Sequence, residues 1–232
     1  MMNPERKCKI KIVENGPYIV TGSVPLSEKI IVSKGKVTEL EDGRKLPQAA
    51  KYALCRCGES KNAPFCDGAH VKAGFKGAEK ASREKFEDRA TVIEGPDLDL
   101  LDDHRCAYAR LCHKKDGKAW RLTKNSDNPE LREEAITAAS ECPAGRIVAY
   151  TKTGEALEIE YEPSIEILQD PEQHASAAIS VKGNIPIEAS DGYTYEIRNR
   201  VTLCRCGKSK IKPFCDASHI DTDRLKAAGF VV

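Results

Sequence analysis

Residues Leu54 to His70 have the sequence Leu-Cys-Arg-Cys-Gly-Glu-Ser-Lys-Asn-Ala-Pro-Phe-Cys-Asp-Gly-Ala-His. The chain contains a second copy of this stretch, Leu-Cys-Arg-Cys-Gly-Lys-Ser-Lys-Ile-Lys-Pro-Phe-Cys-Asp-Ala-Ser-His, from Leu203 to His219. Three cysteines and one histidine occur in each copy at the spacing Cys-x-Cys-x8-Cys-x3-His. Because the same pattern returns, the sequence predicts two similarly folded units on one chain.

The similarity continues upstream of each copy. Residues 18–26 (Tyr-Ile-Val-Thr-Gly-Ser-Val-Pro-Leu) correspond to residues 179–187 (Ile-Ser-Val-Lys-Gly-Asn-Ile-Pro-Ile). Both stretches are rich in β-branched residues and are interrupted by Gly and Pro, which is typical of short strands. A second strand is expected near Tyr52–Leu54 and near Tyr193–Leu203, so that each unit is a small β-rich module leading into its loop.

Overall composition restricts the class of protein. The chain has 37 Lys and Arg against 36 Asp and Glu, a net charge of +1, so nucleic-acid binding through a basic surface is not expected. The polar N-terminal residues lack the apolar core of a secretory signal, and no run of 18 apolar residues occurs. We therefore expect a cytoplasmic protein that does not cross a membrane.

The ten cysteines are the main chemical feature of the sequence. Only 6% of the residues are aromatic, which favours several small modules over one large core. Small modules usually need disulfides or metal for stability, and a chain without an export signal favours metal. Scattered buried thiols are the alternative, but they would not produce the regular spacing.

Each repeated loop can bring four ligands to one place. Gly58 and Gly207 permit a close approach of the backbone or a positive φ. Cys66 and His70 are four residues apart on an expected short helix with Asp67 as its N-cap, so both can reach one centre. Four such ligands also fit structural zinc, although a Cys-x-Cys pair is less typical of zinc sites.

Both loops resemble the CDGSH iron–sulfur domain, whose pattern is Cys-x-Cys-x2-Ser/Thr-x3-Pro-x-Cys-Asp-Gly-Ser/Ala/Thr-His. The first loop matches this pattern throughout, whereas the second has Ala217 in place of the glycine. The resemblance implies a [2Fe–2S] cluster in each loop. The implied ligands are Cys55, Cys57, Cys66 and His70 at the first site, and Cys204, Cys206, Cys215 and His219 at the second.

The resemblance also implies a β-rich fold whose two copies pair about a twofold axis. Because both copies lie on one chain, we expect an internal pseudo-dimer and a monomer rather than an obligate homodimer. A histidine ligand removes negative charge from a cluster and raises its reduction potential relative to an all-cysteine site. Imidazole can also be protonated near neutral pH, which makes His70 and His219 candidates for tuning the function.

A third group of cysteines lies between the two loops. Cys106 and Cys112 occupy the first and third positions of a ferredoxin-like Cys-x2-Cys-x2-Cys run, in which Ala109 replaces the middle cysteine. Cys142, followed by proline, corresponds to the remote ligand of such runs. The segment resembles a divergent single-cluster ferredoxin domain over roughly Asp102 to Thr151, which implies a [3Fe–4S] or [4Fe–4S] cluster.

The local pattern in this middle segment predicts a helix that starts at Asn128-Pro129 and leads to Cys142. Strands are expected at residues 119–122 and 146–150. The alternative is that the three thiols are ordinary core residues. His104 and His113 flank the cysteines but are not assigned as ligands, and Cys8 is expected to be a plain side chain on an N-terminal strand.

The sequence thus predicts an α+β protein of three modules: CDGSH-type residues 1–85, ferredoxin-like residues 86–164 and CDGSH-type residues 165–232. The leading hypothesis is electron transfer between soluble redox partners. The alternatives are a carrier or redox and pH sensor that releases [2Fe–2S] to a cluster-accepting protein, and a structural zinc protein. No phosphate loop, nucleophile elbow or other substrate site is recognisable, so we do not expect an enzyme.

Overall fold

The computed structural model describes residues 8–220, which form three β-sheets and a few short helices. The chain is therefore a β-rich α+β protein, as expected. The first sheet has the order β12 (Ile187–Glu188), β1 (Lys9–Ile12), β2 (Tyr18–Thr21) and β5 (Lys51–Leu54). The second has the order β13 (Arg200–Leu203), β11 (Ile179–Lys182), β10 (Ser164–Gln169), β3 (Leu26–Lys34) and β4 (Val37–Asp42). The third has the order β6 (Thr91–Glu94), β7 (Leu98–Asp102), β8 (Ile147–Thr151) and β9 (Ala156–Leu157).

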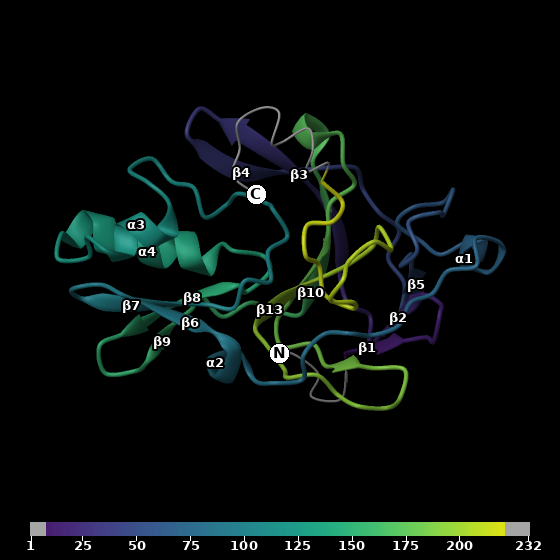
Figure 1. The fold of residues 1–232 in the computed structure, drawn as a ribbon. Coiled ribbons are helices and arrows are strands. Elements are labelled where there is room, and N and C mark those ends of the chain that lie inside the picture. The colour runs from purple at the N-terminus through teal and green to yellow at the C-terminus, as the bar shows by residue number, and fades with distance from the viewer. Residues whose placement is uncertain (1–7, 221–232) are drawn as a thin grey trace.

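The helices are short except for one. They are α1 (Ala69–Lys72), α2 (Phe86–Arg89), α3 (Ala119–Thr123), α4 (Pro129–Ser140) and the 3-10 helix η1 (Pro171–Gln173). In Figure 1 the third sheet and its two helices lie at one end of the molecule, α1 lies at the other, and the second sheet lies between them. Within residues 8–220, no helix has the length and apolar character needed to cross a membrane.

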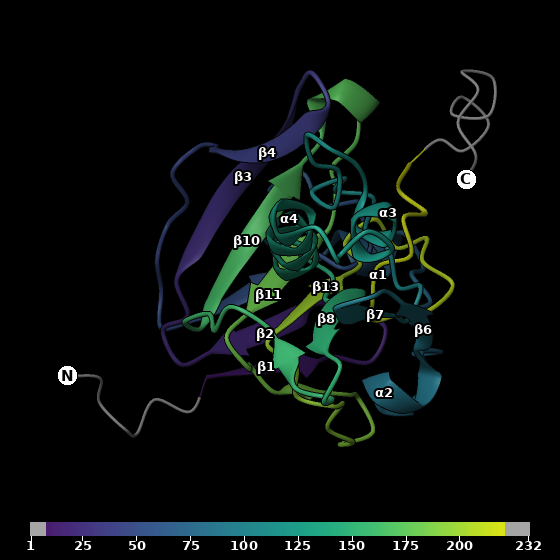
Figure 2. The same ribbon diagram turned by 90° about the vertical axis from the view of Figure 1, so that its left-hand side faces the viewer.

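The two repeats exchange strands. β3 from the first repeat pairs in parallel with β10 just before the second, with Leu26 opposite Ile165. β1 and β12 also pair in parallel, with Ile10 opposite Ile187. Each of the first two sheets therefore contains strands from both halves of the chain, and Figure 2 shows β3 and β10 running side by side. The predicted boundaries at 1–85 and 165–232 separate strands that share hydrogen bonds, and residues 1–7 and 221–232 lie outside the described part.

One apolar core joins these two sheets. Its members alternate along each strand, as a one-sided β-sheet requires: Tyr18 and Val20 are buried in β2, while Ile19 and Thr21 are only half-buried. Side chains from both repeats contribute to the same cluster, including Ile10, Leu54, Ile165, Ile179, Leu203 and Phe214. This shared core positions the ends of β5 and β13, from which the two cysteine loops leave.

The middle segment has its own core between the third sheet and α3 and α4. The predicted helix is confirmed: the Asn128 side chain accepts hydrogen bonds from the N–H groups of Glu130 (2.9 Å) and Leu131 (3.2 Å). The strand expected at residues 146–150 is confirmed as β8. The strand expected at 119–122 is wrong, because these residues form α3. Ala119 and Leu122 are both buried, and a spacing of three places them on one face of a helix.

Candidate metal centres

The first loop leaves the end of β5 and folds back on it. The N–H of Cys55 donates to the carbonyl of Pro64 (2.8 Å), and the N–H of Cys66 donates to that of Ala53 (2.9 Å). The peptide bond from Ala63 to Pro64 is cis. The backbone therefore holds the Cys-x-Cys turn beside the third cysteine of the loop.

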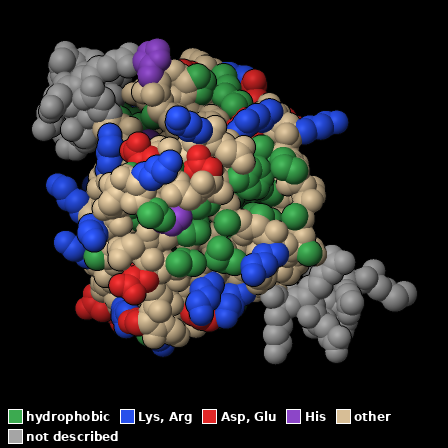
Figure 3. Space-filling model, turned by 90° about the vertical axis from the view of Figure 1, so that its right-hand side faces the viewer, with side chains coloured by type: hydrophobic (Ala, Val, Ile, Leu, Met, Phe, Trp, Pro, Cys, Tyr) green, Lys and Arg blue, Asp and Glu red, His purple; other side chains and the backbone are tan. Residues whose placement is uncertain are grey.

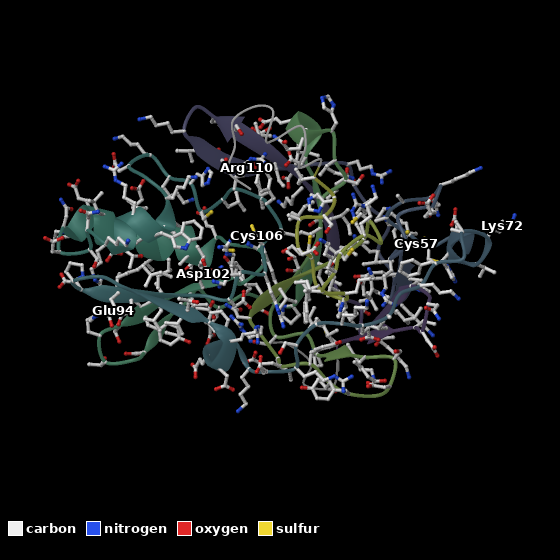
Figure 4. All side chains as sticks on the ribbon, viewed as in Figure 1. Cys57, Lys72, Glu94, Asp102, Cys106 and Arg110 are labelled. Carbon is white, nitrogen blue, oxygen red and sulfur yellow. The ribbon has the colours of Figure 1, made fainter. Side chains whose placement is uncertain are left out.

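The four predicted ligands of this loop meet as two pairs. The Sγ atoms of Cys55 and Cys57 are 3.6 Å apart, and the Sγ of Cys66 is 3.4 Å from Nδ1 of His70. Two sulfurs bound to one tetrahedral metal at about 2.3 Å are separated by about 3.8 Å, so each pair has the spacing of two ligands of one metal atom. Figure 4 shows Cys57 at the end of the molecule that carries α1.

The second loop repeats this geometry. The Sγ atoms of Cys204 and Cys206 are 3.6 Å apart, and the Sγ of Cys215 is 3.5 Å from Nδ1 of His219. The same two backbone hydrogen bonds close the loop, from Cys204 to Pro213 (2.8 Å) and from Cys215 to Thr202 (2.9 Å). The structure thus brings together all eight ligands that the CDGSH resemblance implied, in two equivalent sets.

Matching polar side chains support both loops. The Ser60 hydroxyl donates to the Phe65 carbonyl (2.6 Å), and the Ser209 hydroxyl donates to the Phe214 carbonyl (2.7 Å). The Asp67 carboxylate accepts from the N–H groups of Ala69 (3.0 Å) and Lys61 (2.8 Å), and Asp216 does the same in the second loop. These bonds hold the pKa of Asp67 below its usual value. The expected N-cap assignment is wrong, because the residue that caps α1 is Gly68.

Burial governs the thiols in the metal-free chain. It raises the pKa of Cys57 to about 11, with the neighbouring Cys55 as a further cause, and it also raises the pKa of Cys215. Burial likewise lowers the pKa of His219 to about 4, and the Nε2 atom of this histidine is buried without a hydrogen-bond partner. The hydrogen bond with Cys206 instead lowers the pKa of Cys204 to about 6. Binding of a metal must therefore displace the protons of Cys57 and Cys215, whereas the His219 imidazole is already in the neutral form that a metal needs.

Two arginines that the sequence analysis did not single out lie beneath the loops. Arg56 and Arg205 occupy the x of Cys-x-Cys and are 1% and 6% exposed. Arg56 donates to the carbonyl of Val13 (3.0 Å), and Arg205 donates to that of Ala177 (2.9 Å) and to Oε1 of Gln169 (2.9 Å). The sequence does contain a signal for these residues, because an arginine occurs at the same position in both copies. Each is a buried arginine that lies between two candidate cysteine ligands in the sequence.

The two loops also contact each other. A Cβ atom placed on Gly58 would lie 2.8 Å from the carbonyl oxygen of Cys206, and one on Gly207 would lie 2.5 Å from that of Cys57. These contacts are reciprocal, since each glycine approaches the second cysteine of the opposite loop. Both glycines also have positive φ values, 85° and 74°. Glycine is therefore required at these positions for two independent reasons.

The three cysteines of the middle segment line one small cavity. Cys106 and Cys112 reach it from one loop and Cys142 from the segment after α4, and Trp120, Arg110 and Arg146 also line it. Tyr108 and Arg110 have φ values of 56° and 61°, and this left-handed turn lets the Tyr108 N–H donate to Sγ of Cys106 (3.3 Å). Burial, reinforced by the other two thiols, raises the pKa of Cys112 to about 12.

A buried carboxylate lies beside this cavity. Asp102 accepts from Arg146 Nε (2.6 Å) and Nη2 (2.8 Å) and from the Trp120 indole N–H (2.9 Å). Burial alone would raise the pKa of Asp102, but these bonds and that from the His104 N–H (2.8 Å) outweigh it and lower the pKa. Figure 4 shows Asp102 next to Cys106 and below Arg110. The sequence pattern did not identify this network.

The remaining candidate side chains lie elsewhere. The side chain of His104 is 67% exposed and lies 3.7 Å from Asp102, and neither His104 nor His113 is among the residues lining the cavity. Cys8 precedes β1, and its thiol donates to the carbonyl of Gly22 (3.6 Å). In the part of the chain from residue 8 to residue 220, no three His, Cys, Asp or Glu side chains form a single-ion metal site.

Comparison with known proteins agrees with the two repeated loops. The family model described as "Iron-binding zinc finger CDGSH type" matches residues 15–71 and 177–220, which together include all eight ligands of the two loops. No curated protein and no solved structure matches the chain. The ferredoxin-like resemblance of the middle segment stays a prediction. Two segments of this chain thus match a CDGSH-type iron-binding domain, which supports an iron–sulfur protein.

Proposed function

We propose that this protein is an electron carrier with one [2Fe–2S] cluster in each repeated loop. The observation that supports this most strongly is the arrangement of each ligand set as two close pairs, Cys–Cys at 3.6 Å and Cys–His at 3.4 to 3.5 Å. Two pairs suit a centre of two iron atoms, each of which takes two protein ligands. A single zinc ion instead needs all four ligands within one tetrahedron.

Bound clusters would supply one-electron redox chemistry, and the protein would set their potentials. His70 and His219 would each replace a thiolate by a neutral ligand, which raises the potential. The buried, positively charged side chains of Arg56 and Arg205, each flanked by two candidate cysteine ligands, would act in the same direction, because positive charge stabilises the more negative reduced state. This chemistry requires no organic substrate, and the proposal assigns no bond-forming reaction to the chain.

The cavity lined by Cys106, Cys112 and Cys142 fits a third cluster, of [3Fe–4S] or [4Fe–4S] type. The donor set is three thiols, which is the set expected when the middle cysteine of a ferredoxin run is missing. The left-handed turn at Tyr108 and Arg110 directs a backbone N–H group at the sulfur of Cys106, and such N–H to sulfur bonds are typical of iron–sulfur loops.

We further propose that the two CDGSH-type segments form an internal pseudo-dimer in a monomeric protein. Three observations support this: β1 pairs in parallel with β12, β3 pairs in parallel with β10, and each loop glycine lies against a cysteine of the opposite loop. The redox partners would be soluble proteins in the cytoplasm.

A second candidate function is delivery of a [2Fe–2S] cluster to an acceptor protein. It is favoured by the position of His70 on α1, a helix that buries none of its four residues, and by Val71, which is 74% exposed. Both histidines are half-buried, but the Nε2 atom of His219 is buried without a partner, so His70 is expected to leave its cluster more readily. Cluster half-life measured against pH separates the two functions, because a carrier of electrons retains its clusters through repeated redox cycles.

Analysis of iron, zinc and acid-labile sulfide in anaerobically purified protein tests the proposal, together with the visible spectrum. About seven or eight irons per chain with matching sulfide support all three clusters. About four irons support the two loops and leave the central cysteines as core thiols. A colourless protein with about two zinc ions and no sulfide would overturn the redox function.

A further inference from the structure

The two repeats differ at the residue four positions before their first cysteine. In the first repeat this residue is Lys51, which is exposed at the start of β5. In the second repeat it is Arg200 at the start of β13, and only 1% of this arginine is exposed. A buried arginine in place of an exposed lysine indicates a specific set of partners, because an unpaired buried charge is costly.

The partners of Arg200 belong to the central three-cysteine site. Its Nε donates to the carbonyl of Cys142 (2.8 Å), and its Nη2 donates to the carbonyls of Ala139 (2.9 Å) and Ile147 (3.2 Å). The Ala139 carbonyl lies in the last turn of α4 and the Cys142 carbonyl lies just beyond it, where a cation is favourable. Each also accepts a backbone N–H, from Cys142 (3.1 Å) and Gly145 (3.0 Å) respectively. The strand that delivers Cys204 to the second loop therefore also holds the backbone of Cys142.

The backbones of Gly145 and Arg200 are also in close contact. A Cβ atom on Gly145 would lie 2.4 Å from the carbonyl oxygen of Arg200, so only glycine fits between Cys142 and β13. Arg200 also lies 2.5 Å from the carboxylate of Glu158, which balances its charge. Movement of β13 must therefore move the turn that follows Cys142.

A second connection joins the other side of the same two sites. Arg105 precedes Cys106, and its guanidinium lies over the ring of Phe214, 4.6 Å from the ring centre, immediately before Cys215. Ala107, Ala178 and Cys215 form one buried cluster, with Ala144 packed against it. Cys215 of the second loop is thus packed with Ala107 and Ala144, which lie one and two residues after Cys106 and Cys142 of the central site.

We propose that the central three-cysteine site and the second loop form one coupled unit, with Arg200 and Arg105 as its positioning residues. The first loop touches the second loop at Gly58 and Gly207, but the coupling to the central site does not extend to it. Loading of the central site then changes the reduction potential of the second loop and leaves that of the first loop unchanged. This inference rests on the proposed function, since it requires that clusters bind at these ligands.

Midpoint potentials of single loops test the coupling. A full-length C55S/C66S background keeps the four candidate ligands of the second loop but not those of the first. A C204S/C215S background does the reverse, and both keep the three central cysteines. Adding C112S to each background removes one candidate ligand of the central site and leaves Arg105 and Arg200 in place. We expect C112S to change the oxidised-to-reduced ratio of the second loop, read at a fixed potential by electron paramagnetic resonance, by about threefold or more. The first loop is expected to change by less than the error.

Substitution of the proposed positioning residue provides the second test. R200Q is expected to shift the second-loop potential and alter the spectrum of the central site, R200K to restore part of both, and the matched variant K51Q to change neither. Equal shifts in both loops, or no shift with C112S and R200Q, would overturn the coupling. If R200Q fails to fold, the comparison of C112S in the two backgrounds still tests whether the central site is coupled to the second loop. Absence of every iron–sulfur signal in the unmodified protein would instead overturn the proposed function.

Discussion

Gly68 and Ala217 occupy equivalent positions in the two metal loops and share a left-handed backbone, with φ values of 87° and 65°. The CDGSH pattern has glycine here, and the departure at Ala217 left the local geometry open at the level of sequence. The structure keeps the same turn with alanine, so the second loop retains its ligand geometry while its Cβ atom is in a strained conformation.

The first prediction concerns this strain. A217G is expected to stabilise the protein by about 0.5 kcal/mol, because relief of the left-handed strain exceeds the added entropy of the unfolded chain. The matched change G68A is expected to destabilise it by about 1 kcal/mol. Urea unfolding of both variants measures these differences, and a destabilised A217G would contradict the account.

Asp102 provides the second prediction at the residue scale. Its pKa is lowered in the folded chain, so it stabilises the fold above its unfolded pKa of about 3.9, and this contribution is lost as the pH falls through the lower folded value. D102N removes that pH dependence and is expected to cost about 2 kcal/mol at neutral pH, because Arg146 loses a buried charged partner. Unfolding midpoints between pH 2 and pH 7 test this, with the exposed D127N as control.

Local sequence rules succeed for some elements and fail for others. α4 was predicted because its start is encoded locally, by Asn128 as the cap and Pro129 in the first turn. α3 was not, because the five residues Ala119–Thr123 are too short to show a helical period. Packing against α4 and the third sheet decides their conformation.

The third prediction concerns the cap of α4. N128A is expected to destabilise the chain by about 1 kcal/mol, because two N–H groups of the first turn lose their acceptor. The neighbouring exposed Asp127, changed to alanine, is expected to have a much smaller effect. Thermal unfolding of the two variants compares them, and equal losses would show that the Asn128 side chain is not the cap.

Charge is unevenly distributed over the whole molecule. Residues 1–85 contain 17 Lys and Arg against 10 Asp and Glu, whereas residues 86–164 contain 11 against 17. Figure 3 shows the face of the molecule that carries α1, where blue lysine and arginine side chains outnumber red acidic ones. Lys72 extends from this end of the molecule in Figure 4. The net charge of +1 therefore conceals a basic end and an acidic end.

The fourth prediction follows from this distribution. An acidic redox protein is expected to react at the basic end, with a rate that falls as salt is added. Stopped-flow reduction with an acidic ferredoxin measures this rate. The K61E/K72E variant is expected to be about tenfold slower at low salt, and K115E/K124E in the middle segment to be no slower. A rate independent of salt would exclude this surface as the site of electron entry.

The sequence by itself determined the candidate ligands of the two loops, the presence of three cysteines in the middle and the position of α4, because spacing within a loop and capping of a helix are local properties. Only the tertiary structure decided that β3 pairs with β10, that Arg56 and Arg205 are buried, and that Arg200 contacts Cys142. Strand pairing over more than a hundred residues depends on which apolar faces pack together. Several strands of this chain have similar short β-branched patterns, so the pattern alone does not choose among their partners.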